Sequence, residues 1–186
     1  MNKNYLIVVD VQNDFIDGAL GSKEAQAVLP NICNVIRNHK GPVIATMDTH
    51  VPGEYGLEFR TIGIPHCLYD HLGWHMPEEV LNALNYQGCF MGYVKKNSNG
   101  SIDLVDAIKN IEKSIVLCPD VIPTFTIIGL DTDICVVSNA LILRAAFPES
   151  EITVYTDCCA GSTPQKHNQA LAVMQSCNIV NKVSTQ

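Results

Sequence analysis

The chain has 186 residues, of which 47% are hydrophobic and 17% are charged, a balance typical of a single core-rich domain and not of a disordered segment. Its net charge of -7 argues against nucleic acids and anionic membranes as partners. Because no apolar run reaches about 18 residues, we expect no membrane-spanning helix.

The cysteine content predicts a reducing environment. The eight cysteines are scattered along the chain, several of them inside apolar runs, and none forms a C-x-x-C pair. In a chain of this size without a signal-peptide pattern, reduced thiols are more common than a disulfide framework. Residues 1–5 lead directly into an apolar run and lack such a pattern. We therefore expect a cytoplasmic protein.

Apolar runs and helical patterns alternate along most of the chain. The apolar runs predict strands at 5–9, 43–47, 89–94, 125–128, 152–155 and 179–183. The helical patterns predict helices at 24–38, 77–85, 101–111, 136–146 and 164–176. Strands that alternate with helices favour right-handed βαβ units, and so a three-layer α/β/α fold with a parallel, Rossmann-like sheet.

Two stretches have no sustained period, and we expect loops there. The first covers residues 11–21. The second, 49–76, is polar and aromatic and contains four glycines. A connection this long is uncommon in a compact domain unless it has a function.

The stretch from Thr124 to Ala140 places a cysteine where a strand changes into a helix. With Thr132 or Asp133 as the N-cap, Cys135 falls in the first helical turn. Backbone N–H groups there lack intrahelical partners and the helix dipole favours anions, so the thiol should ionise readily and an oxyanion could be held. This arrangement is known from hydrolases, and the alternative is an ordinary buried core cysteine.

Four polar or reactive residues lie at or just beyond the ends of predicted strands: Asp10, Asp48, Lys96 and Cys135. In a parallel sheet these ends share one edge, where ligands bind at the topological switch point. With the first strand central, the fourth beside it and the second and third on its other side, Asp10 and Cys135 would flank that point. Their chemistry suggests Cys135 as nucleophile, Asp10 as general base and Lys96 as a cation that lowers the thiol pKa.

A second cluster consists of Asp48-x-His50, Glu58 and His66. Residues two apart in an extended segment face the same side, so Asp48 and His50 could bind one ion. Pro65 fixes the backbone just before His66. Carboxylate and imidazole ligands suit Zn, Mn, Fe or Ni, and the ligand pattern does not rank these metals. We expect a divalent metal and take zinc as the working assignment, with Mn, Fe or Ni as alternatives.

The motifs that carry this chemistry resemble those of the isochorismatase-like cysteine hydrolases. They are residues 8–15 (Val-Val-Asp-Val-Gln-Asn-Asp-Phe), 48–50 (Asp-Thr-His), 65–67 (Pro-His-Cys), Lys96, and 129–136 (Gly-Leu-Asp-Thr-Asp-Ile-Cys-Val). They occur in the order of the family and span nearly the whole chain. The metal-type set is most similar to that of nicotinamidases, which deamidate nicotinamide to nicotinate and ammonia.

The resemblance implies a single domain over residues 1–186 with a six-stranded parallel sheet. It implies a catalytic triad of Asp10, Lys96 and Cys135, and a non-proline cis peptide bond before Asp131. The backbone N–H groups of Asp131 and Cys135 would hold the substrate oxygen. Lys95 is an alternative to Lys96, because a shift of one residue in a strand reverses its facing, and the spacing to residues 100–101 favours Lys96.

The resemblance also implies roles around the metal. Asp48, His50 and His66 would hold the metal, which would bind the pyridine nitrogen and orient the ring. Glu58 matches the position of a fourth, acidic ligand in some relatives, and Phe15 matches an aromatic residue that contacts the ring.

Two positions depart from the nicotinamidase pattern, and both concern the walls of the substrate site. Ile64 occupies a place where tryptophan is usual, and residues 97–101 (Asn-Ser-Asn-Gly-Ser) replace a segment that often carries an aromatic residue.

We predict a cysteine-dependent amidohydrolase that acts through a thioester on a small aromatic or heterocyclic carboxamide such as nicotinamide. An isochorismatase or another small-molecule hydrolase of the superfamily is the alternative. A non-enzymatic metal or redox protein, using the Asp-His-His set and the thiols, is an alternative of another class. The expected partner is a small-molecule substrate, with neither nucleic acid nor membrane, and the resemblance implies a homo-oligomer.

Overall fold

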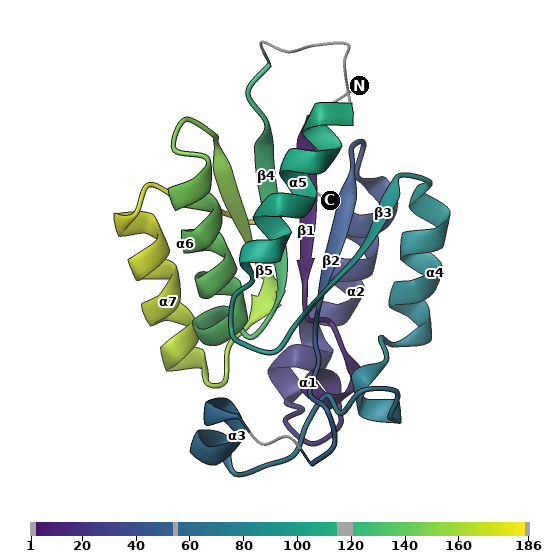
Figure 1. Cartoon of the computed structure of the whole chain (residues 1–186). Coiled ribbons are helices and arrows are strands. Elements are labelled where there is room, and N and C mark those ends of the chain that lie inside the picture. Colours follow the sequence, from purple (N-terminus) through teal and green to yellow (C-terminus); the bar gives the residue numbers. More distant parts are fainter. Residues whose placement is uncertain (1–2, 54–55, 115–120, 185–186) are drawn as a thin grey trace.

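The computed structural model describes residues 3–53, 56–114 and 121–184. Its centre is a six-stranded parallel sheet with the order β3-β2-β1-β4-β5-β6 (Figure 1). The strands are β1 (Asn4–Val9), β2 (Val43–Asp48), β3 (Phe90–Lys96), β4 (Thr124–Leu130), β5 (Ile152–Ala160) and β6 (Val180–Lys182). This order confirms the predicted arrangement, with the first strand between the second and the fourth.

Helices cover both faces of the sheet, which confirms the three-layer fold (Figure 1). They are α2 (Lys23–Asn38) and α4 (Glu78–Gln87) on one face, and α5 (Ile102–Ser114), α6 (Val137–Ala146) and α7 (Pro164–Ser176) on the other. Side chains of β1 alternate between the two cores: Leu6 and Val8 pack with α2, and Tyr5 and Ile7 pack with α5 and α6. Because both faces are covered, the central strands are mostly apolar.

Three short helices lie in the stretches where the sequence predicts loops. They are α1 (Asn13–Ile16), α3 (Leu57–Ile62) and the 3₁₀ turn η1 (Leu72–Trp74). Each is too short to show a helical period, and α1 depends on partners distant in sequence. The backbone N–H of Asn13 donates to the His75 carbonyl at 2.8 Å, and its side-chain amide donates to the Leu72 carbonyl at 2.9 Å. The long connection thus folds back against α1.

The sequence predicts reduced cysteines and no membrane-spanning helix. The described cysteines are free. The adjacent Cys158 and Cys159 belong to the cores on opposite faces of the sheet, so their thiols point apart. Among residues 3–53, 56–114 and 121–184, none of the helices has the length and apolar character that crossing a membrane requires.

Gly129, in β4, is paired with Val9 of β1. Its φ of +128° is one that L side chains rarely adopt, and an added Cβ would collide with the backbone of Val9. We expect Gly129→Ala to destabilise the fold by more than about 4 kcal/mol, because strain and overlap add. Gly88, with φ +78° and no atom within 4 Å of an added Cβ, is the matched control, and its replacement should cost about 1–2 kcal/mol. Urea unfolding compares the two variants, and equal losses would contradict this account.

Candidate active site

The ends of β1, β2, β3 and β4 bring four buried functional side chains to one edge of the sheet. Asp10 directly follows β1, and Asp48 and Lys96 are paired residues at the ends of β2 and β3. Cys135 lies in the turn after β4. All four are less than 10% exposed. The structure therefore brings together the residues that the strand-end argument singled out.

Lys96 lies between the carboxylates and the thiol. Its Nζ is 2.7 Å from Asp10 Oδ2, 3.5 Å from Cys135 Sγ and 3.3 Å from Asp48 Oδ1. The Lys96 ammonium thus contacts the other two members of the proposed triad and also Asp48 of the neighbouring Asp-His-His group.

Lys95 and Lys96 face opposite sides of β3, as residues adjacent in a strand must. The Lys96 side chain is buried at the site. The Lys95 ammonium lies over the rings of Tyr69 and Trp74, 4.5 and 5.2 Å from their centroids. Only Lys96 is therefore placed to act on the thiol.

Burial governs the protonation of the site. It raises the pKa of the Cys135 thiol well above its usual value, the Asp10 carboxylate raises it further, and Lys96 opposes both. This corrects the expectation of a readily ionised thiol, since the sequence shows the cation and the helix start but not the depth of burial. Burial also raises the pKa of Asp10 against the opposing Lys96 charge. The resting pair is a protonated thiol beside a carboxylate that accepts protons more readily than usual.

Lys96 is charged. Burial lowers the pKa of Lys96, but the carboxylates of Asp10 and Asp48 outweigh burial and raise the pKa above its usual value. The ammonium can therefore compensate the negative charge that moves between the thiol and the carboxylate.

The helix that carries Cys135 begins differently from the prediction. Residues Thr132–Val136 form a π-helical turn, η2, which leads into α6, and the N-cap position is Asp131. The side chains of Thr132 and Asp133, the predicted caps, bind residues in and just before α7. Thr132 Oγ1 hydrogen-bonds with His167 Nδ1 at 2.8 Å, and Asp133 accepts from the Ser162 N–H at 2.7 Å. Because these side chains bind partners distant in sequence, neither of them caps the helix that carries Cys135.

Asp131 itself lies at the bend between β4 and η2. The peptide bond between Leu130 and Asp131 is cis, at the position where the resemblance places such a bond. The Asp131 carbonyl accepts from the N–H groups of Ile134 and Val136 at 3.1 and 3.0 Å. Burial, with the nearby Asp133 and Asp10 charges, raises the pKa of Asp131 to about 7.

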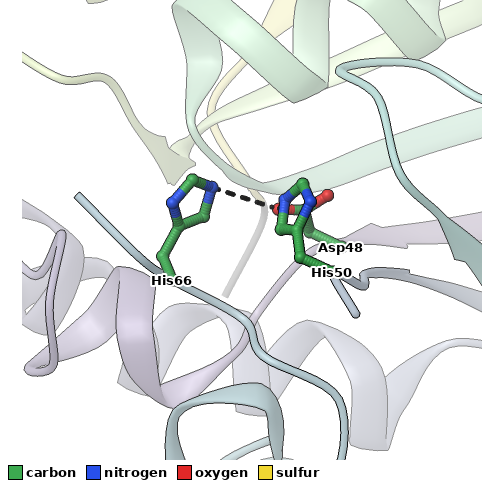
Figure 2. Close-up of side chains that lie close together, drawn as sticks. All are labelled: Asp48, His50 and His66. Atoms are coloured by element: carbon green, nitrogen blue, oxygen red, sulfur yellow. Dashed lines mark hydrogen bonds and ion pairs between the residues drawn. The ribbon is translucent and has the colours of Figure 1, made fainter. Parts of the chain in front are cut away.

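Asp48, His50 and His66 point toward one another (Figure 2). One ligand atom from each lies within 4.8 Å of the others. Asp48 Oδ2 is 2.8 Å from His50 Nε2 and 3.4 Å from His66 Nε2. Burial would raise the pKa of Asp48, but hydrogen bonds from the two histidines and the Lys96 charge outweigh it and lower the pKa. Two imidazoles and an ionised carboxylate at this spacing fit a divalent transition metal.

Neighbouring groups orient these three side chains. His66 Nδ1 is 2.8 Å from the Ile64 carbonyl. Since a carbonyl only accepts, Nδ1 donates its proton to it, and Nε2, which faces Asp48, is the nitrogen left to bind a metal. Gln12 brackets the Asp48 backbone: its Oε1 accepts from the Asp48 N–H at 2.8 Å and its amide donates to the Asp48 carbonyl at 2.9 Å.

Glu58 and Phe15 are the two remaining residues to which the resemblance gives a role. Glu58 belongs to α3, and its side chain lies outside the part of the chain that the structure describes. Phe15 is buried in α1, with its ring centroid 5.9 Å from that of His66. It therefore contacts the Asp-His-His group from the side of α1.

Sequence reasoning assigned no role to two further residues. Gln12 stands inside the first motif and brackets Asp48, as described above. Thr46 donates to Asp10 Oδ1 at 2.7 Å. Because Thr46 stands two residues before Asp48 in an apolar strand, its hydroxyl faces the same side as Asp48, and this alternation is the only sequence feature that points to its role.

A cavity of about 580 Å³ opens beside these groups. Its wall includes His50, a member of the Asp-His-His group, and Ile134, which directly precedes Cys135 in the chain. The rest of the wall comes from the turn 97–100 after β3 and from residues in and just before α3, namely Gly56, Leu57, Phe59, Thr61 and Ile62. Its volume is in the range that proteins use for small-molecule ligands.

Comparisons with known proteins agree with this fold. The family model described as Isochorismatase domain matches residues 4–186. A search of curated proteins found no match.

Several solved structures share the fold. A pyrazinamidase of Pyrococcus horikoshii in complex with zinc is 24% identical, with a TM-score of 0.74 over 98% of this chain and 99% of that chain. A pyrazinamidase/nicotinamidase from Streptococcus mutans is 21% identical, with a TM-score of 0.80 over 96% and 99%. N-carbamoylsarcosine amidase from Thermoplasma acidophilum is 23% identical, with a TM-score of 0.71 over 100% and 98%. Since the family model covers almost the entire sequence, the chain belongs to the isochorismatase family.

Proposed function

We propose that this protein is a cysteine-dependent amidohydrolase that cleaves a small aromatic or heterocyclic carboxamide such as nicotinamide. The observation that carries the proposal is the contact of Lys96 with both Asp10 and Cys135, beside a cavity of substrate size. Membership of the isochorismatase family supports a hydrolase. The nicotinamidases and amidases of the same fold favour an amide bond as the target.

The reaction begins at the protonated thiol. As the Cys135 sulfur attacks the carboxamide carbon, its proton passes to Asp10, so that no free thiolate builds up. Negative charge develops on the substrate oxygen, where the backbone N–H groups of Asp131 and Cys135 are the proposed donors, each worth about 3–4 kcal/mol by analogy with other oxyanion holes. Lys96 compensates the transferred charge.

The intermediate then collapses. The C–N bond breaks, the nitrogen takes the proton held by Asp10, and ammonia leaves a thioester on Cys135. A water molecule gives its proton to Asp10 and attacks the thioester, which releases the carboxylic acid and returns the proton to the sulfur. Amide and water thus yield acid and ammonia. Because the cycle needs a reduced Cys135, a cytoplasmic location remains part of the proposal.

Asp48, His50 and His66 would hold a divalent metal, which supplies a Lewis-acid contact for a substrate heteroatom when bound. Two neutral imidazole nitrogens and a carboxylate suit zinc, with Mn, Fe or Ni as alternatives, and the zinc complex of the P. horikoshii protein favours zinc. The side chains of this set orient the substrate ring so that its carboxamide faces Cys135.

We expect the purified protein to bind about one divalent ion per chain, and His66→Ala to lose it because one of three ligands disappears. Elemental analysis after dialysis measures the content. His71→Ala is the control, since His71 is exposed and lies outside the group. Equal metal content in the two variants would remove the site from this account.

A substrate panel tests the proposed activity. Ammonia release is measured with nicotinamide and pyrazinamide, and hydrolysis of the vinyl ether is measured with isochorismate. The proposal predicts turnover of at least one aromatic carboxamide. Turnover of isochorismate alone would support the other family chemistry, and metal binding without any hydrolysis would support the non-enzymatic alternative.

A further inference from the structure

Asn139 is a fully buried polar side chain in α6. Its Oδ1 accepts the backbone N–H of Ser101 at 3.0 Å. Its Nδ2 donates to the carbonyl of Cys135 at 2.9 Å and, over a longer 3.4 Å, to the carbonyl of Asn99. One amide thus joins the backbone of the proposed nucleophile to both sides of the turn at Gly100.

The chemistry of these partners requires an amide. Ser101 offers a donor and needs an acceptor, whereas the two carbonyls need donors. Only asparagine or glutamine supplies one oxygen and two N–H groups on one planar head, and glutamine is longer by one methylene. The Ser101 N–H also precedes α5, where backbone N–H groups have no partner inside the helix.

The bridged turn forms one wall of the cavity. Residues 97–100 line it together with residues of α3 and Ile134, which directly precedes Cys135 in the chain. The turn also lies directly on α6, because a Cβ added at Gly100 would come within 2.6 Å of Ile142 Cδ1 and 3.1 Å of Ser138 Cβ. The distance between this wall and the nucleophile is therefore set by α6 and by Asn139.

The catalytic groups have separate anchors. Lys96 is held by the pairing of β3 with β2, and the turn of Cys135 is held by the Asp131 carbonyl. Residues 97–100 lie beyond the end of β3, outside the sheet. Loss of the Asn139 bridge should therefore move the cavity wall more than the reacting atoms.

We propose that Asn139 is a positioning residue that fixes the substrate-facing turn 97–100 against the nucleophile turn. This rests on the proposed function of the site. Asn139→Ala should raise KM for the accepted carboxamide about tenfold or more while kcat changes less than about threefold, because the wall shifts and the triad does not.

Ser138→Ala is the matched control. Ser138 is the preceding residue of α6, and its Oγ donates to the carbonyl of Ile134 at 2.6 Å. The variant thus removes a hydrogen bond to the nucleophile turn and none to residues 97–101, and both constants should stay within about twofold of the wild type. Equal KM values in the two variants would overturn the proposal, as would a loss confined to kcat.

Amide hydrogen exchange gives a readout that needs no activity. In the wild type and in Ser138→Ala the Ser101 N–H should exchange slowly, and in Asn139→Ala at least about tenfold faster. If the wild type hydrolyses no amide, the proposed function fails and exchange alone decides on the bridge. An unprotected Ser101 N–H in the wild type rejects the bridge even if Asn139→Ala does not fold.

Discussion

Replacing Cys135 with alanine is expected to lower amide hydrolysis by at least about 10⁴-fold, because no other group can form the acyl intermediate. The fold should persist, since alanine keeps the small apolar volume at this buried position and removes only the sulfur. Ammonia release measures activity, and circular dichroism with thermal melting measures the fold.

Cys159→Ala is the matched control for this experiment. Cys159 is also buried and belongs to the same core as Cys135, but it lies in β5 and is absent from the described contacts of the triad. The control should lose a comparable amount of stability and keep its activity within about twofold. A Cys135→Ala protein that retains full activity would end the proposed mechanism.

Replacing Asp10 with asparagine should lower kcat by about 10²- to 10⁴-fold, the range for loss of a general acid–base. Asparagine has the shape of aspartate but cannot take the thiol proton. It also leaves the buried Lys96 ammonium without its nearest counterion, so stability should fall as well. Steady-state kinetics and urea unfolding measure both effects.

Thr46→Val gives a graded control for the same carboxylate. It removes only the hydrogen bond to Asp10 Oδ1, so the carboxylate remains but is less firmly oriented. We expect a loss in kcat of about tenfold or less. If Thr46→Val lost as much as Asp10→Asn, orientation and not proton transfer would be the main contribution of Asp10.

Much of the site could be predicted because the positions follow from topology. Apolar runs that end at Asp10, Asp48 and Lys96 predict the ends of buried parallel strands, and such ends share an edge. The alternation of side chains along a strand then separates Lys95 from Lys96, once the register of β3 is known. These are properties of local sequence combined with a general rule of α/β folds.

The remaining features depend on contacts between distant residues. The pKa of Cys135 rises because of its burial, which a helix start and a nearby lysine do not reveal. The short helix η1 of the long connection rests on contacts with α1. The side chains of Thr132 and Asp133, which the sequence predicts as caps of their own helix, instead bind partners in and before α7. The bridge of Asn139 spans nearly 40 residues, so no local pattern marks it.

The thioester on Cys135 is the central claim, and trapping it is the most direct test. The enzyme is mixed with a slowly hydrolysed carboxamide, quenched in acid and digested, and the peptides are analysed by mass spectrometry. We predict the acyl mass on the peptide that contains Cys135, bound through its sulfur. Steady hydrolysis with Cys135 unmodified, or with the acyl group on another residue, would contradict the account.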